Sequence, residues 1–181
     1  MSLSAILKSG HLRINSTENR LEIEGFSSHI PYSDLSASSW GYVYEKYVGQ
    51  ILETEGYDVI YNGLEFGFLD KGIDLIAKKD SEMKLIQCKF NSKISKSKIE
   101  WILYKASKEL LRYSENKNFK IVFVLIVNNK ENSFSTSMSK GFRLTFTPTN
   151  KIEFPILQYF LDHNYIQDKV KLEFREIEME R

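Results

Sequence analysis

Two short segments near the start of the chain alternate hydrophobic and polar residues. "LRIN" (12–15) and "RLEIE" (20–24) have this period, and the polar "STEN" separates them. Such alternation is typical of a half-buried strand, and a short polar segment between two such runs indicates a hairpin. We leave the opening "MSLS" out of the fold prediction as a remnant of cloning. The pattern predicts a β-hairpin whose hydrophobic side is formed by Leu12, Ile14, Leu21 and Ile23.

After a polar connection at "SSHIPYSDLSASS" (27–39), the hydrophobic positions follow a helical period. Hydrophobic residues recur at helical spacing from Trp40 to Glu55, and Gly56 follows at the position that a helix C-cap favours. A second helix is predicted over 97–113, because one hydrophobic stripe has helical spacing there. The stripe consists of Ile99, Ile102, Leu103, Ala106, Leu110 and Tyr113.

Strands are predicted where residues alternate or are hydrophobic throughout. "YDVIY" (57–61) is a short strand, and "DKGIDLIAKKDSEMKLIQCKF" (70–90) contains two strands around "KKDSEM". "IVFVLIV" (121–127) is hydrophobic throughout and rich in β-branched residues, which indicates a strand covered on both faces. Toward the C-terminus we predict a strand at "FRLTF" (142–146), a helix at "FPILQYFLDH" (154–163) and a strand at "VKLEFREIE" (170–178), in which the alternation stops at Ile177.

Composition excludes several classes of protein. The chain has 181 residues, 42% hydrophobic and 27% charged, as is usual for one globular domain with a short appendage. A net charge of +1 excludes a histone-like polycation but is compatible with a local basic groove. The single cysteine, Cys88, excludes an internal disulfide and a cysteine-rich zinc site. With neither a run of about 18 apolar residues nor a secretion leader, we expect no membrane span and a cytoplasmic protein.

Three polar residues share one face of the predicted hairpin. On "MKLIQCKF", Gln87 and Lys89 lie on the side opposite Cys88, because side chains two apart in a strand share a face. A two-residue loop at 80–81 sets Asp74 directly opposite Gln87, and a slip by one whole residue sets it opposite Lys89. In both registers the side chains are neighbours, with Cβ atoms about 5 Å apart. A half-step slip would instead set Asp74 across from Cys88 and separate the three.

An acid, an amide and an amine at this range can serve metal-dependent chemistry. A carboxylate and an amide oxygen are hard ligands suited to Mg²⁺. The Lys89 ammonium beside them would act on a phosphate or on an attacking water. The structural alternative is a cross-strand pair between Asp74 and Lys89, which would contribute about 0.2–1 kcal/mol.

Glu45 is a further candidate, on the first predicted helix. It lies beside Val48 and Leu52, at the edge of the hydrophobic stripe. A solvated glutamate is ordinary at such a position. Its place one helix ahead of the hairpin nevertheless favours a role in the same site.

The segments "GYVYEKYVGQILETEGYDVIYNG" (41–63) and 70–90 resemble the restriction-endonuclease-like PD-(D/E)XK superfamily. The likeness is closest to the Mrr-type nucleases, through a helix of the form G-x-x-[FY]-E and strands of the forms G-[IV]-D-L-I and Q-C-K. Archaeal Holliday-junction resolvases are also similar across the helix and first strand. The resemblance covers about 40–127. It implies an α/β fold with a central mixed β-sheet flanked by helices (αβββαβ), as a nuclease domain over 39–181 preceded by an N-terminal β-hairpin appendage over 1–38.

The resemblance also implies a role for each site residue. Asp74 takes the place of the central metal-binding carboxylate, and Glu45 that of the helix glutamate that completes the metal site. Gln87 stands where Glu or Asp is more common, and Lys89 is the signature lysine. The main-chain carbonyl of Cys88 comes within reach of the metal, so its thiol would point into the core.

Two residues depart from the family pattern. Ile73 replaces the proline of the signature, a substitution common in the superfamily. Gln87 removes one negative charge, which fits the Mrr-type variant and should weaken metal affinity. The metal implied is Mg²⁺, with Mn²⁺ as a substitute.

Two functions remain open on these residues. The first is a metal-dependent endonuclease that cuts DNA, in restriction of foreign DNA or in repair and junction processing. The alternative is a catalytically weak or inactive module of the same fold that binds DNA or serves in an assembly. Glu45, Asp74 and Lys89 are all present, which favours the enzyme.

Basic residues beyond the hairpin are candidates for contact with DNA. Lys93, Lys96 and Lys98 directly follow the catalytic strand, and we expect them to contact phosphates. On the second helix, Lys105, Lys108 and Arg112 are expected to form a solvated face rather than a DNA contact.

We also expect a homodimer, because one such site cuts one strand and twofold pairs are the commonest oligomers. The hydrophobic sides of the N-terminal hairpin and of 170–178 are the candidate interfaces.

Overall fold

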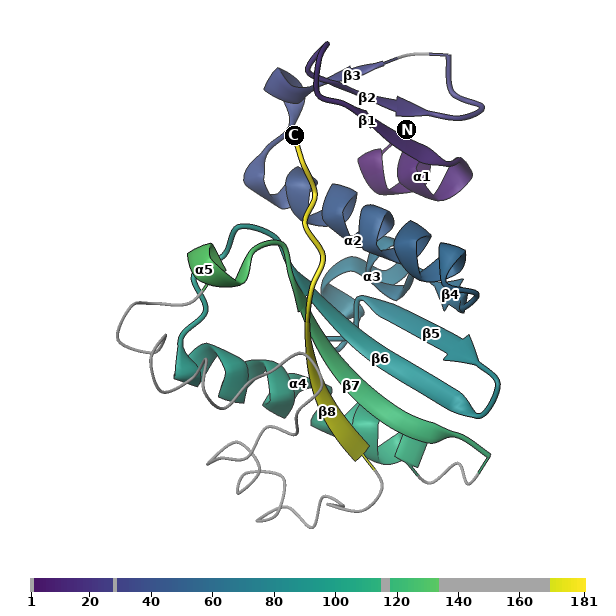
Figure 1. Ribbon diagram of the computed structural model, residues 1–181, viewed down its shortest axis with the longest axis vertical. Helices are drawn as coiled ribbons and strands as arrows, with labels where there is room; N and C mark the ends of the chain where they lie inside the picture. The colour runs from purple at the N-terminus through teal and green to yellow at the C-terminus, as the bar shows by residue number, and fades with distance from the viewer. Residues whose placement is uncertain (1, 28, 115–117, 134–169) are drawn as a thin grey trace.

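The computed structural model describes residues 2–27, 29–114, 118–133 and 170–181 (Figure 1). A five-stranded mixed sheet forms the centre of this described part, with strands in the order β4-β5-β6-β7-β8. The strands β4, β5 and β6 are antiparallel neighbours, whereas β6, β7 and β8 run parallel. This α/β architecture confirms the expected fold class. The strand bounds are Asp58–Ile60 (β4), Leu75–Lys79 (β5), Glu82–Lys89 (β6), Lys120–Val127 (β7) and Val170–Glu176 (β8).

Two long helices, both predicted, cover opposite faces of the sheet. α2 (Ala37–Thr54) packs on the face that carries Ile86, and α4 (Lys96–Ser114) packs on the face that carries Leu85. Consecutive strand residues point to opposite faces, so β6 contributes to both hydrophobic layers. β7 is buried on both faces from its second residue to its last, as its uninterrupted hydrophobic sequence predicts.

Helix α2, which carries Glu45, has a defined end on each side. At its N-terminus the Ser36 hydroxyl accepts a hydrogen bond from the Ser39 N–H at 3.1 Å. Past its C-terminus, Gly56 has a φ of +86° and Tyr57 donates its N–H to the Leu52 carbonyl at 3.0 Å. This is the Schellman arrangement, which confirms the expected glycine at the helix end.

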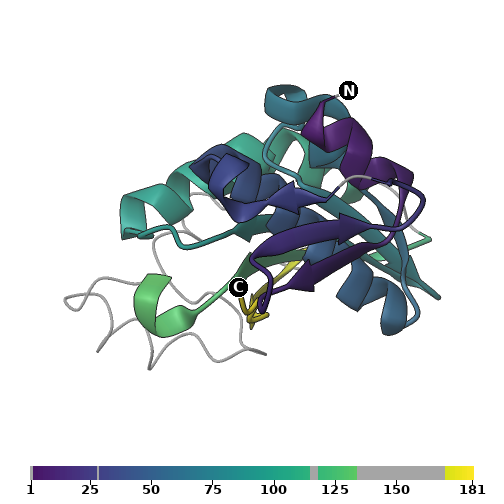
Figure 2. The same cartoon turned by 90° about the horizontal axis from the view of Figure 1, so that it is seen from above.

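The N-terminal residues form a second, smaller sheet that lies over α2 (Figures 1 and 2). Its first two strands, β1 (Leu12–Asn15) and β2 (Arg20–Ile23), pair as the predicted hairpin. The connection that follows adds a third strand, β3 (Ile30–Pro31), and a short 3₁₀ helix, η1 (Tyr32–Asp34), neither of which was predicted. The boundary between 1–38 and 39–181 stays a prediction.

Leaving "MSLS" out of the fold prediction was wrong. Helix α1 (Leu3–Ser9) starts within these residues, and the Ser2 hydroxyl accepts a hydrogen bond from the Ala5 N–H at its N-terminus. The helix is held in place because Ile6 and Leu7 are buried in the α2-side core.

The two hydrophobic surfaces expected at a dimer interface are occupied within the chain. Leu12, Leu21 and Ile23 of the hairpin are buried against α2. Phe174 of β8 is buried in the core beneath α4. These four side chains are therefore not available to a dimer interface, and the homodimer itself stays a prediction.

The remaining elements are short. α3 (Asn62–Phe66), a 3₁₀ turn η2 (Gly67–Leu69) and α5 (Lys130–Ser133) were not predicted. β8 ends at Glu176, where the alternation stops. The segments predicted at 142–146 and 154–163 lie outside the described residues. No helix in the described part of the chain has the length and hydrophobicity needed to cross a bilayer.

Candidate active site

The register of the β5–β6 hairpin brings the predicted polar residues together. Lys79 pairs with Glu82 across a two-residue loop, and Leu75 pairs with Ile86 at the other end of the ladder. The next residues beyond that last pair are Asp74 and Gln87, so the predicted register is confirmed. Both face the α4 side of the sheet, as the strand alternation requires.

Asp74 is held rigidly at the point where β5 begins. Its side chain is only 2% exposed. One carboxylate oxygen, Oδ2, accepts hydrogen bonds from the Cys88 N–H at 2.6 Å and from the Gln87 amide nitrogen. Its backbone is fixed on two sides, because its N–H donates to the Ile86 carbonyl and its carbonyl accepts from the Gly63 N–H, each at 2.7 Å.

Glu45 reaches the same place from α2. Its Oε2 atom is buried and has no hydrogen-bond partner among the described residues. Burial, followed by the charges of Asp74 and Asp70, raises the pKa of Glu45 to about 9, and Lys89 opposes this shift. The side chain as a whole is half-buried, but its Oε2 atom is not solvated, which is evidence against the fully solvated position considered from the helical wheel.

The two carboxyl groups compete for ionisation in one confined space. Burial raises the pKa of Asp74 to about 7, while Lys89 and the Cys88 N–H act in the opposite direction. A buried carboxylate without a compensating cation is costly, so each group favours a proton or a nearby positive charge. The arrangement is suited to binding a cation.

Lys89 supplies part of that positive charge from the end of β6. Its ammonium lowers the pKa of both Glu45 and Asp74, which places it within electrostatic range of both carboxyls. Among the ion pairs of the described residues, none joins Lys89 to Asp74 or Glu45. The structural alternative, a direct cross-strand ion pair between Asp74 and Lys89, is thus not seen.

Comparison with protein families supplies the identity of this domain. The family model described as "Restriction endonuclease", of the Mrr catalytic type, matches residues 49–167. The chain belongs to the restriction endonuclease family. The matched residues include Asp74, Gln87 and Lys89 and begin shortly after Glu45. Neither the curated proteins nor the solved structures gave a match.

Gly63 makes room for Glu45. A Cβ atom at position 63 would lie 2.5 Å from the Glu45 Oε2 atom and 3.3 Å from the Asp74 Cα atom. Both distances are shorter than ordinary contacts, and the Asp74 backbone is fixed by hydrogen bonds. A side chain at this position would therefore push the Glu45 carboxylate away from Asp74.

Replacing Gly63 with Ala should lower metal affinity and cleavage by about 10–100-fold, the usual effect of disturbing a residue that orients a ligand. Metal titration and cleavage rates measure the two effects. The control is Gly41→Ala on α2, where a new Cβ meets nothing within 4 Å. Wild-type affinity in Gly63→Ala, or an equal loss in the control, would show that the close contact does not matter.

Asp70 belongs to the site but was missed in the sequence. Its negative charge raises the pKa of both Asp74 and Glu45. Its carboxylate accepts the Gly72 N–H at 2.7 Å, which closes a turn in which Lys71 and Gly72 both have positive φ. The "DKG" sequence was the available signal, since Asp followed two residues later by Gly is typical of such a turn.

The structure describes the predicted basic residues to different degrees. Lys93 and Lys98 are exposed, and Lys96 begins α4, with a side chain outside the described part. Their contact with phosphates stays a prediction. Lys105 was expected only as part of a solvated face. It is exposed but lies beside the turn, since a Cβ at Gly72 would be 3.2 Å from the Lys105 Cβ and 3.6 Å from the Gln87 Oε1 atom.

The donor set fits a hard divalent cation such as Mg²⁺. Among the described residues, no group of three or more His, Cys, Asp and Glu side chains is arranged to hold a metal. The candidate site instead combines two carboxylates, Glu45 and Asp74, with the Gln87 amide. The unpartnered Glu45 oxygen is the observation that fits a cation, because a buried carboxylate oxygen otherwise has a partner. The Cys88 thiol is buried in the α2-side core, and a metal contact of its carbonyl stays a prediction.

Without metal, the stability of the protein should fall as the pH rises. Folding raises the pKa of Glu45 from 4.5 to about 9 and that of Asp74 from 3.8 to about 7. The folded state therefore binds these protons more tightly than the unfolded state. Stability is greatest at a pH below the unfolded pKa values, and it falls as the pH rises toward the folded pKa values. Each carboxyl contributes a slope of up to about 1.4 kcal/mol per pH unit. Melting temperatures in EDTA should show this slope, and Glu45→Gln should flatten it; identical profiles would contradict the assignment.

Proposed function

We propose that this restriction endonuclease hydrolyses phosphodiester bonds of DNA with the help of Mg²⁺, for which Mn²⁺ can substitute. The observation that supports this most is the pair of carboxyls formed by Asp74, which is buried, and Glu45, whose Oε2 atom is buried without a partner among the described residues. A bound cation would remove the cost of ionising both groups. A module that only binds DNA would have no use for this uncompensated pair.

The ligands would be Glu45, Asp74 and the amide oxygen of Gln87, with the Cys88 carbonyl as a further donor. When bound, the metal would act as a Lewis acid that polarises the scissile phosphate and lowers the pKa of a bound water. Lys89, within electrostatic range of both carboxyls, would orient the attacking water and stabilise the negative charge that gathers on the phosphate oxygens. Lys93, Lys96 and Lys98 would hold the DNA backbone. In-line attack would leave a 5′-phosphate.

Gln87 currently presents its amide nitrogen, not its oxygen, to Asp74. The nitrogen supplies the hydrogen bond that the carboxylate needs, and ligation through the oxygen would need the amide to rotate. Replacing Gln87 with Glu should therefore tighten Mg²⁺ binding by at least about tenfold, because even with the full screening of water a charge at about 4 Å contributes about 1 kcal/mol for each charge of the cation. Isothermal titration measures this. Weaker binding in Gln87→Glu would mean that position 87 does not face the metal.

The test of this function uses the ends of the DNA product. The protein is incubated with linear DNA and Mg²⁺, and the purified fragments are joined with DNA ligase without prior phosphorylation. Ligation shows 5′-phosphate ends, as in-line attack predicts. Fragments that can be joined only after treatment with a kinase would contradict the mechanism, and intact DNA would contradict the enzyme.

The biological setting belongs to the same proposal. The protein would act in the cytoplasm, in restriction of foreign DNA or in repair and junction processing. Cutting both strands needs two such sites, so we also propose a homodimer. Its interface could not use Leu12, Leu21, Ile23 or Phe174, which are buried within the chain.

A further inference from the structure

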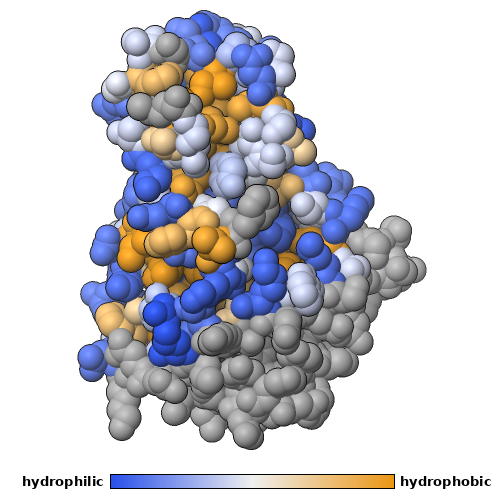
Figure 3. Space-filling view, turned by 180° about the vertical axis from the view of Figure 1, so that it is seen from behind, coloured by the Kyte–Doolittle hydropathy of each residue, from blue (hydrophilic) through white to orange (hydrophobic). Residues whose placement is uncertain are grey.

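A pocket of about 260 Å³ opens between the α3–η2 segment and the C-terminal half of α4. Its walls combine hydrophobic, aromatic and charged side chains. The residues that matter here are Phe66, Leu69, Asp70, Arg112 and Tyr113. On the rear face of the molecule, which Figure 3 shows, exposed hydrophobic residues lie beside hydrophilic ones.

The pocket adjoins the catalytic residues. Asp70 and Ile73 both line it, and Asp74 is the next residue along the chain. Asp70 lines the pocket, and its charge also acts on Asp74 and Glu45. A group bound in the pocket would thus lie beside Asp70 and Ile73, next to the candidate site.

Two hydrophobic side chains at the edge of the pocket are unusually exposed. Phe66 is 54% exposed and Leu69 is 78% exposed, although nothing in the fold requires large hydrophobic residues there. Single exposed hydrophobic residues are ordinary, but hydrophobic residues that are exposed together at one pocket commonly mark a binding surface. On the opposite wall, the Arg112 guanidinium lies 4.7 Å from the centre of the Tyr113 ring.

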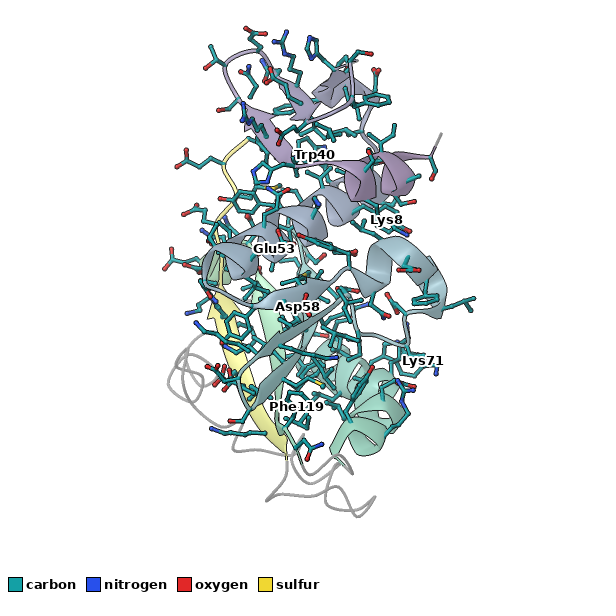
Figure 4. The ribbon with its side chains drawn as sticks, turned by 90° about the vertical axis from the view of Figure 1, so that its right-hand side faces the viewer. Lys8, Trp40, Glu53, Asp58, Lys71 and Phe119 are labelled. Atoms are coloured by element: carbon teal, nitrogen blue, oxygen red, sulfur yellow. The ribbon has the colours of Figure 1, made fainter. Side chains whose placement is uncertain are left out.

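Two cationic side chains, Lys71 and Arg112, line the same pocket as Phe66 and Leu69. Lys71, which Figure 4 shows at the outer edge of the molecule beside α4, forms an ion pair of 2.7 Å with Glu109. Arg112 pairs with the same carboxylate at 2.6 Å. Lys105 lies on the same helix, next to the turn that ends at Gly72. A single buried acid therefore holds two cations at the pocket, and Lys105 lies beside Gly72 at the end of the neighbouring turn.

We propose that this pocket binds one unstacked nucleobase of the substrate DNA, next to the phosphate that is cut. This inference rests on the proposed function. A nucleobase has apolar faces, which suit Phe66, Leu69 and Tyr113. It also has polar edges within reach of Asp70 and Arg112, and it is attached to phosphates that Lys71 and Lys105 can contact.

Size and position favour a base over other ligands. The pocket is smaller than the range of about 300–1,000 Å³ that drug-sized ligands and cofactors occupy. A base from a neighbouring nucleotide arrives with the substrate, because the sugar–phosphate chain connects it to the scissile phosphate. Unstacking is easiest where a base has no partner, so such DNA should be preferred.

The test compares two short duplexes of the same sequence, one fully paired and one in which a single base faces an abasic site. Binding is measured by fluorescence anisotropy in Ca²⁺, and the positions of the cuts are mapped in Mg²⁺. The wild-type protein should bind the duplex with the unpaired base on the order of tenfold more tightly, as expected for one stacking contact. Its cuts should lie next to that base.

The double variant Phe66→Ala, Leu69→Ala should bind both duplexes equally and still cut paired DNA. The matched control is Ile60→Ala, which removes an exposed hydrophobic residue of β4 that does not line the pocket. It should keep the preference. Equal binding by the wild type, or a preference that survives in the double variant, would overturn the inference. Cutting without a preference would leave the proposed function intact, whereas a preference without cutting would contradict that function and support the pocket.

Discussion

Replacing Asp74 with Asn should lower DNA cleavage by at least about 10²–10³-fold while the protein stays folded. Asn keeps the size of the side chain and an oxygen that can accept the Cys88 N–H, but it removes the charge. The cost of ionising a buried carboxyl beside Glu45 and Asp70 disappears with it. The melting temperature in EDTA at neutral pH should therefore be unchanged or higher.

Cleavage rates and thermal melting of the same preparation separate this result from simple misfolding. A loss of cleavage together with a large drop in melting temperature would show a structural role for Asp74. Residual cleavage above about one per cent of the wild-type rate would count against a metal-binding role, because loss of a charge-stabilising group costs more than that.

Replacing Lys89 with Ala should abolish cleavage and leave the affinities for metal and DNA almost unchanged. Lys89 lies within range of both carboxyls, and none of the ion pairs of the described residues joins it to either. Its ammonium can therefore act on charge that develops only in the transition state. Such an interaction changes turnover without changing binding of the ground state.

Two other roles for Lys89 predict different results. A phosphate contact would lower DNA affinity in the variant and reduce the salt dependence of binding by about one charge. A purely structural role would lower stability by up to about 1 kcal/mol and leave most of the activity. Binding isotherms in Ca²⁺ at several salt concentrations, with single-turnover cleavage in Mg²⁺, distinguish the three. Retained cleavage with normal stability would remove Lys89 from the mechanism.

Local patterns in the sequence were enough to predict the centre of the site. The two-residue loop at 80–81 and the alternation along β6 fix the register, and the register sets Asp74 opposite Gln87. The helical stripes of α2 and α4 were predicted for the same reason, since each reflects one face buried against the sheet.

Features that depend on tertiary contacts were not predictable. On a helical wheel, a buried Glu45 cannot be distinguished from a solvated one, because its burial depends on the approach of α3 at Gly63. α3 itself is five residues long and has no side-chain cap, so it leaves no pattern. The role of Asp70 depends on a turn that folds its charge back toward Asp74.

The central claim is that Glu45, Asp74, Gln87 and Lys89 form a metal-dependent nuclease site. Cleavage of supercoiled plasmid DNA tests it most directly, with wild-type protein and Asp74→Asn purified side by side. We expect nicked and linear products from the wild type in Mg²⁺ or Mn²⁺, no products from it in EDTA, and no products from Asp74→Asn with either metal. Cleavage by the wild type in EDTA, or equal cleavage by Asp74→Asn, would contradict it, as would intact plasmid under every condition.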